Sequence, residues 1–161
     1  MKLYRITTAA FLLIATPHSF ALDSACAPIL AAGEARTKLA AWHSIANLSN
    51  MQMESMKING QFFQKLHGKW MKSRINFDEN EKTMIQQVTN GTIKLTECKS
   101  LGADVVDGIP VNVVSSKIEM PGAPASTSKL YIGKQDGLPY KQIGDTVNVV
   151  YKYKGFSAPQ L

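Results

Sequence analysis

Cysteine, charged residues and long apolar runs are all scarce in this sequence, and each scarcity excludes a class of protein. Only 2 of the 161 residues are cysteine, which excludes a small fold built from many disulfides. No stretch reaches the roughly 20 consecutive apolar residues of a membrane-spanning helix. Charged residues make up 19% and hydrophobic residues 45%, which excludes a disordered chain. The sequence therefore predicts a packed globular protein.

Motifs for catalysis and for cofactor binding are also missing. The sequence has no Gly-x-Ser-x-Gly elbow, no glycine-rich phosphate loop and no His-x-x-x-His pair. Beyond the first 21 residues the histidines are His43 and His67, and the carboxylates stand singly at predicted turns and caps. We therefore expect a protein that is not an enzyme and that has no cofactor and no metal site.

The first 21 residues have the pattern of a secretory signal peptide. Two basic residues precede a short apolar run at 6–15, and small or uncharged residues stand at Ser19 and Ala21. We expect cleavage after Ala21, which leaves a single domain, 22–161, with 16 basic and 12 acidic side chains. The predicted location is the periplasm.

Export determines how the two cysteines are interpreted. In an oxidising compartment, Cys26 and Cys98 predict one structural disulfide, and the Cys-x-x-Cys spacing of a redox-active pair is absent. Acylation of Cys26, as in a lipoprotein, is the alternative. The leucine that such a signal carries three residues earlier is replaced here by Asp23, so we expect the disulfide.

Two helices are predicted. Pro28 suits a first helical turn, and apolar residues then recur at spacings of three and four from Ile29 to Trp42. The polar side of this helix carries Glu34, Arg36 and Lys38. The second helix is shorter, with Asp78 as its N-cap, Glu81 in the capping-box position and Gly91 as its end.

The remaining sequence alternates as β-strands do. Asn59-Gly60 and His67-Gly68 are turn pairs, which divide positions 52–74 into a meander of three strands. Period-two alternation returns at 111–118 and at 147–153. The predicted fold class is α+β, a curved antiparallel sheet or half-barrel that wraps the N-terminal helix and one short second helix.

Two clusters suggest binding chemistry. Met51, Met53 and Met56, with His43 upstream, offer thioethers that suit Cu(I), although strand alternation places Met56 on the opposite face. The lysines around Trp70 look like a basic patch with stacking aromatics. Alternation sends most of those lysines to solvent, and export removes contact with nucleic acid. We expect no nucleic-acid partner, and assign the charge to solubility or transient contact with anionic lipids.

The order of motifs resembles a known family. It comprises a helix led by Cys26, then 59–70, Cys98, Leu-Tyr-Ile-Gly-Lys at 130–134, Gly-Leu-Pro-Tyr-Lys at 137–141, and a Tyr-rich strand followed by Ala158-Pro159. This order resembles small bacterial periplasmic proteins similar to the LolA/LppX superfamily of lipoprotein carriers. The resemblance implies an unclosed antiparallel barrel around helices, with an apolar cavity that takes acyl chains. Because a shared fold does not imply a shared function, the fold transfers better than lipoprotein carriage.

Together these observations predict a monomeric, non-catalytic periplasmic protein that binds a lipophilic ligand, such as an acyl chain. The second hypothesis is an interaction module for an envelope protein, and the third is methionine-based copper handling. The expected lining of a ligand cavity is Leu39, Trp42, Phe63, Trp70, Met84, Ile132 and Tyr151.

Overall fold

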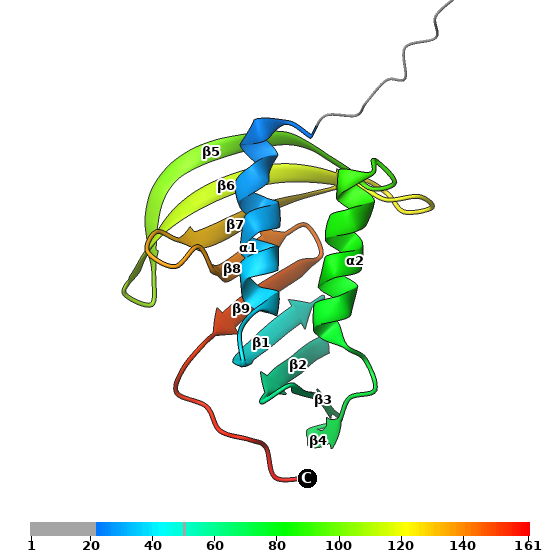
Figure 1. Ribbon diagram of the computed structural model, residues 1–161, viewed down its shortest axis with the longest axis vertical. Helices are drawn as coiled ribbons and strands as arrows, with labels where there is room; N and C mark the ends of the chain where they lie inside the picture. Colours follow the sequence, from blue (N-terminus) through cyan, green and yellow to red (C-terminus); the bar gives the residue numbers. More distant parts are fainter. Residues whose placement is uncertain (1–21, 50) are drawn as a thin grey trace, which may run out of the picture.

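The computed structural model describes residues 22–49 and 51–161, and two α-helices lie across one face of its sheet (Figure 1). The elements are η1 Ser24–Cys26, α1 Ala27–Thr37, β1 Ala41–Leu48, β2 Met51–Ile58, β3 Gln61–Leu66, β4 Lys69–Lys72, α2 Phe77–Thr89, β5 Lys94–Val106, β6 Ile109–Glu119, β7 Ser126–Gly133, β8 Pro139–Gly144 and β9 Val147–Lys152. The expected signal peptide and its cleavage site lie outside the described residues. None of the helices described here is long and apolar enough to span a membrane.

The nine strands form one antiparallel sheet in the order β4-β3-β2-β1-β9-β8-β7-β6-β5. The chain therefore starts the sheet near its middle, builds one half through β4, and adds the other half after α2. The sheet does not close, because β4 and β5 remain as separate edges. Figure 1 shows the sheet curving behind α1 and α2. The predicted fold class, an α+β half-barrel with two helices, is confirmed.

Tight turns and bulges give the sheet its shape. Asn59-Gly60 and His67-Gly68 each have two positive φ angles, which is the geometry of a type I′ hairpin turn. Both were predicted as turns, and they connect β2, β3 and β4. In β5 the pairing with β6 shifts between Thr96 and Lys99, and again between Ser100 and Gly102. Such bulges bend a strand, so β5 arches around the side of α1.

The first helix is shorter than its apolar periodicity predicts. It ends at Thr37, and Trp42 lies in β1. The helical prediction for Trp42 is wrong because β1 is a central strand, paired with β2 on one side and β9 on the other. Backbone hydrogen bonds along both sides of a strand outweigh a side-chain pattern that either structure can use.

The predicted disulfide is present. The sulfurs of Cys26 and Cys98 are 1.99 Å apart and join η1 to β5. Both cysteines are buried with Val88, Ile93 and Leu95, so the bond fixes the start of α1 against the sheet and the end of α2. With its sulfur in this bond, Cys26 has no thiol for acylation.

Candidate ligand-binding groove

Strand pairing assigns each side chain to one of two faces of the sheet. Directly paired residues share a face, and successive residues alternate. The ring centroids of Trp42 and Phe77 of α2 are 5.8 Å apart. Trp42 therefore marks the face of the sheet that the helices cover, here called the inner face. His43, the next residue, marks the opposite or outer face.

An open hollow of about 380 Å³ lies between the start of α1 and the inner face. Its lining is Ala25, Pro28, Ser100, Asn112, Val114 and Ile132, and we call it the α1 groove. Its apolar floor consists of Val114 and Ile132, which are 6% and 7% exposed and pack with Ala32 of α1. The other side of α1 is closed, because Gly33 lies against Glu81 and Ile85 of α2.

A second open hollow, of about 320 Å³, is lined by three tyrosines on β8 and β9 and just beyond, together with Asp107, Ile109 and Lys152. Tyr140 donates to Asp136 over 2.6 Å, and burial raises the pKa of Tyr140 to about 12. Tyr153 donates to the carbonyl of Pro139, and burial raises its pKa as well. These phenols therefore remain neutral donors at physiological pH. Because Pro139 pairs with Ile132, the tyrosine hollow and the α1 groove border neighbouring strands.

Arg36 connects α1 to the sheet and to α2. Its guanidinium carbon lies 4.9 Å from the ring centre of Trp42 and 5.5 Å from that of Tyr151. The same group donates to Glu81 over 2.7 Å, and the Arg36 side chain is 11% exposed. The sequence pattern assigned Arg36 to the polar side of a helix. In the fold Glu34 and Lys38 are exposed, whereas the Arg36 side chain faces the sheet, where its charge is neutralised by Glu81 and stacks on two rings.

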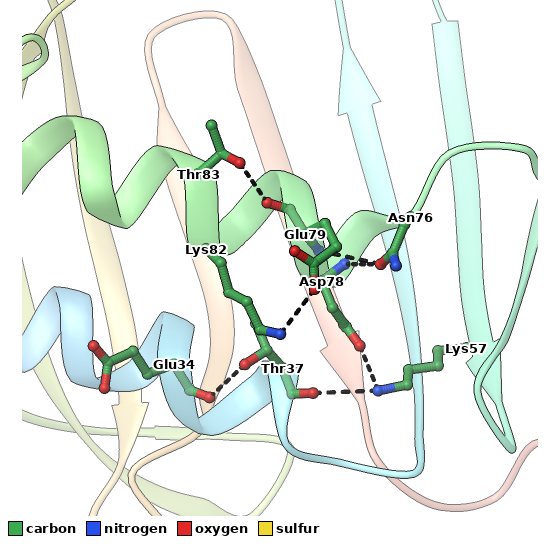
Figure 2. A network of polar contacts seen from close by, with 8 residues as sticks. All are labelled: Glu34, Thr37, Lys57, Asn76, Asp78, Glu79, Lys82 and Thr83. Atoms are coloured by element: carbon green, nitrogen blue, oxygen red, sulfur yellow. Dashed lines mark hydrogen bonds and ion pairs between the residues drawn. The ribbon is translucent and has the colours of Figure 1, made fainter.

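A second buried ion pair lies below the end of α1 (Figure 2). Lys57 of β2 donates to Asp78 over 2.5 Å and to the backbone carbonyl of Thr37 over 3.2 Å. The side chains of Lys57 and Asp78 are 10% and 12% exposed. The pair joins β2, α1 and α2 at one point and holds the two helices over the sheet.

The capping box predicted at Asp78 and Glu81 is wrong. The N-cap of α2 is Asn76, whose side-chain oxygen accepts from the backbone N–H groups of Asp78 and Glu79. Asp78 and Glu81 instead form the two interior ion pairs, with Lys57 and Arg36. Sequence spacing could not reveal this, because their partners are 21 and 45 residues away.

The structure divides the seven expected cavity residues among several places. Ile132 lines the α1 groove, and Tyr151 lines the tyrosine hollow and meets Trp42 around Arg36. Leu39 lies half-buried between α1 and β1, and Met84 on α2 is 44% exposed. Phe63 and Trp70 lie on the outer face. Phe63 pairs with Met56, which pairs with His43, and Trp70 pairs with Lys65, two residues after Phe63 on the same strand.

The methionine cluster does not converge on one point. Met51 and Met53 pair with Leu48 and Ala46 on the inner face, whereas Met56 pairs with His43 on the outer face. Within 22–49 and 51–161, no group of three His, Cys, Asp or Glu residues could hold a metal ion. The geometry gives no support to copper handling by these three thioethers.

Two solved structures have a similar fold. One is the Mycobacterium tuberculosis lipoprotein LppX, with a TM-score of 0.55 and 15% identity over 80% of this chain and 93% of that chain. The other is LprF from Mycobacterium bovis, with a TM-score of 0.55 and 12% identity over 84% and 96%. No family model and no curated protein matches the sequence. The fold is therefore LppX-like, as the resemblance of the motifs implied.

Proposed function

We propose that this protein binds the apolar part of an amphiphilic molecule, such as an acyl chain, in the α1 groove. The observation that carries the proposal is the apolar floor of Val114 and Ile132 in an open hollow of about 380 Å³ beneath α1. Ligand pockets generally measure about 300–1,000 Å³ and combine apolar walls with a few polar groups. Here Ser100 and Asn112 at the rim supply those polar groups.

The tyrosine hollow extends this binding surface. Its rings present apolar faces, the phenol oxygens of Tyr140 and Tyr153 can accept hydrogen bonds, and the ammonium group of Lys152 can donate to a polar headgroup. A chain that buries about 300 Å² of apolar surface gains about 7 kcal/mol before the costs of binding are subtracted. Since 7 kcal/mol alone corresponds to a Kd of about 7 μM and the costs of binding reduce it, we expect a Kd between about 10 μM and 1 mM.

We further propose that the protein works in the periplasm after removal of residues 1–21, without catalysing a reaction. The Cys26–Cys98 disulfide supports this location, because such bonds persist in oxidising compartments. Both hollows offer walls and hydrogen-bond donors without a paired nucleophile and base, which fits binding better than chemistry.

The test is calorimetric titration of delipidated protein with a fatty acid, a lysophospholipid and a hydrophobic dye. Asn112→Phe places a ring in the α1 groove, and Asn148→Phe makes the same change at an exposed strand position on the outer face. We expect Asn112→Phe to weaken binding at least tenfold and Asn148→Phe to leave it unchanged. Equal effects of the two variants, or no binding below millimolar ligand, would refute the proposal and favour the interaction-module hypothesis.

A further inference from the structure

Most of the net charge of residues 22–161 is located on one face of the sheet. Strand register places eight lysines and four carboxylates on the outer face, opposite the helices. These are Lys65, Lys72, Lys94, Lys99, Lys117, Lys129, Lys141 and Lys152, with Glu54, Glu97, Asp104 and Glu119. The remaining charges of 22–161, eight basic and eight acidic, cancel. The strands of the outer face therefore carry an excess of four positive charges, which Asp145, in the turn after β8 on the same face, lowers to three.

Ion pairing leaves part of this face strongly positive. Lys65 is paired with Glu54, and Lys117 lies 3.3 Å from both Glu97 and Glu119. Hydrogen bonds to those two carboxylates raise the pKa of Lys117. In contrast, Lys99, Lys129 and Lys141 form no ion pair with any residue that the structure describes.

Two of the unpaired lysines, Lys99 and Lys129, line a shallow hollow. This hollow, of about 300 Å³, has three lysines and two carboxylates in its lining, and is therefore positive by one charge: Lys99, Lys117, Lys129, Glu97 and Asp145. Lys99 of β5 and Lys129 of β7 both pair with Ser115 of β6, which lies between them. They are thus two strands apart, about 10 Å across the sheet, which is about one Debye length at moderate salt. Their fields therefore add at the hollow.

We propose that the outer face of β5 to β8 docks on a bilayer that contains anionic phospholipid, with a lipid phosphate in this hollow. The ammonium groups of lysines suit a phosphate headgroup, and a lysine near an anionic membrane surface contributes about fivefold in affinity. The aromatic ring that β5 to β8 place on the outer face, that of Tyr131, is half-buried and lies 5.5 Å from the ammonium group of Lys141. This favours a bilayer over a single-stranded nucleic acid, and docking here goes beyond the proposed use of the α1 groove.

The test compares two triple variants in vesicle sedimentation. Lys99→Gln, Lys129→Gln and Lys141→Gln remove three charges from the outer face. Lys38→Gln, Lys69→Gln and Lys134→Gln remove three exposed charges from other surfaces. With vesicles of phosphatidylcholine and phosphatidylglycerol, we expect the first variant to bind about a hundredfold more weakly and the second to bind within a few-fold of the parent. Binding by the parent should fall as salt is raised and should vanish with phosphatidylcholine alone. Thermal unfolding confirms that both variants fold.

Three results would overturn the proposal. The first is equal loss of binding in the two triple variants, and the second is binding of polyglutamate as tight as that of the anionic vesicles. The third is loss of vesicle binding in Asn112→Phe, which would mean that lipid uptake into the α1 groove, and not the outer face, holds the protein on the vesicle. If Asn112→Phe loses fatty-acid binding but keeps vesicle binding, both proposals stand. If the parent binds vesicles but no monomeric ligand, docking stands alone.

Discussion

The guanidinium of Arg36 lies 4.9 Å from the centre of the Trp42 indole, between α1 and the central strand of the sheet. Together with Lys57 and Asp78, this contact places charged groups where a packed domain usually has apolar ones. Burying charge is costly unless every charge is paired, so the two ion pairs determine where each helix can lie. Helix α2 is therefore fixed against one side of α1, and the α1 groove stays open on the other side.

Removing one member of the Lys57–Asp78 pair should destabilise the fold more than removing both. Lys57→Met leaves the Asp78 carboxylate buried without its partner, at a cost of about 3 kcal/mol in the free energy of unfolding. Adding Asp78→Leu should recover most of that loss, as measured by urea denaturation. Lys82→Met, which breaks an exposed pair with Glu79, is the control and should change little. A double variant less stable than Lys57→Met would contradict this account.

Stability should fall with acidification in a window set by His43. Burial lowers the pKa of His43 below its ordinary 6.5, although the hydrogen bond to the Glu54 carboxylate opposes this. His43 therefore binds a proton more readily in the unfolded chain than in the folded protein. The stability contributed by neutral His43 is complete above about pH 6.5 and is lost as the pH falls towards the folded-state pKa. In His43→Gln, the free energy of unfolding from urea denaturation should depend less on pH across this range. His67→Asn, at an exposed turn, should keep the slope of the parent.

The C-terminal segment should protect the outer face near His43. The rings of Phe156 and His43 have centroids 5.9 Å apart, and the neighbouring Met56 and Phe63 are 4% and 5% exposed. Phe156→Ala should let water reach this cluster, cost about 1 to 2 kcal/mol and raise the pKa of His43 towards its ordinary value. An NMR titration of the His43 ring measures the shift. An unchanged titration midpoint would mean that Phe156 does not desolvate this histidine.

The native protein should show no reactive thiol until it is reduced. The disulfide spans 72 residues, for which loop-entropy arithmetic gives about 4 kcal/mol of stability. Reduction should therefore lower the melting temperature by roughly 10 °C. Cys26→Ser with Cys98→Ser should melt at the temperature of the reduced protein. Acyl chains on Cys26, found by mass spectrometry of protein from its own host, would contradict the disulfide.

Turn signals in the sequence predicted the hairpins well, although the capping box and the end of the first helix were wrong. Asn59-Gly60 and His67-Gly68 each favour positive φ, so the hairpins could be located without any tertiary information. The disulfide followed from the count of cysteines and the expected compartment. The half-barrel itself was predicted from alternation together with the family resemblance.

Side-chain placement could not be predicted in the same way. A shift of one residue in strand register moves a side chain to the opposite face, so Phe63 and Trp70 were grouped with residues from which the sheet separates them. The roles of Arg36 and Glu81 depend on a contact across 45 residues, which no local pattern encodes. The α1 groove is likewise formed by residues distant in sequence, and only Ile132 among its lining was anticipated.

The two bulges in β5 have a consequence for the protein at high concentration. An open sheet exposes a row of unsatisfied backbone groups, along which a neighbouring molecule could add strand to strand. In β5 that row is interrupted twice, between Thr96 and Lys99 and between Ser100 and Gly102, so an incoming straight strand would lose its hydrogen-bond register within a few residues. The half-barrel can thus remain open to ligands without polymerising through its longer edge.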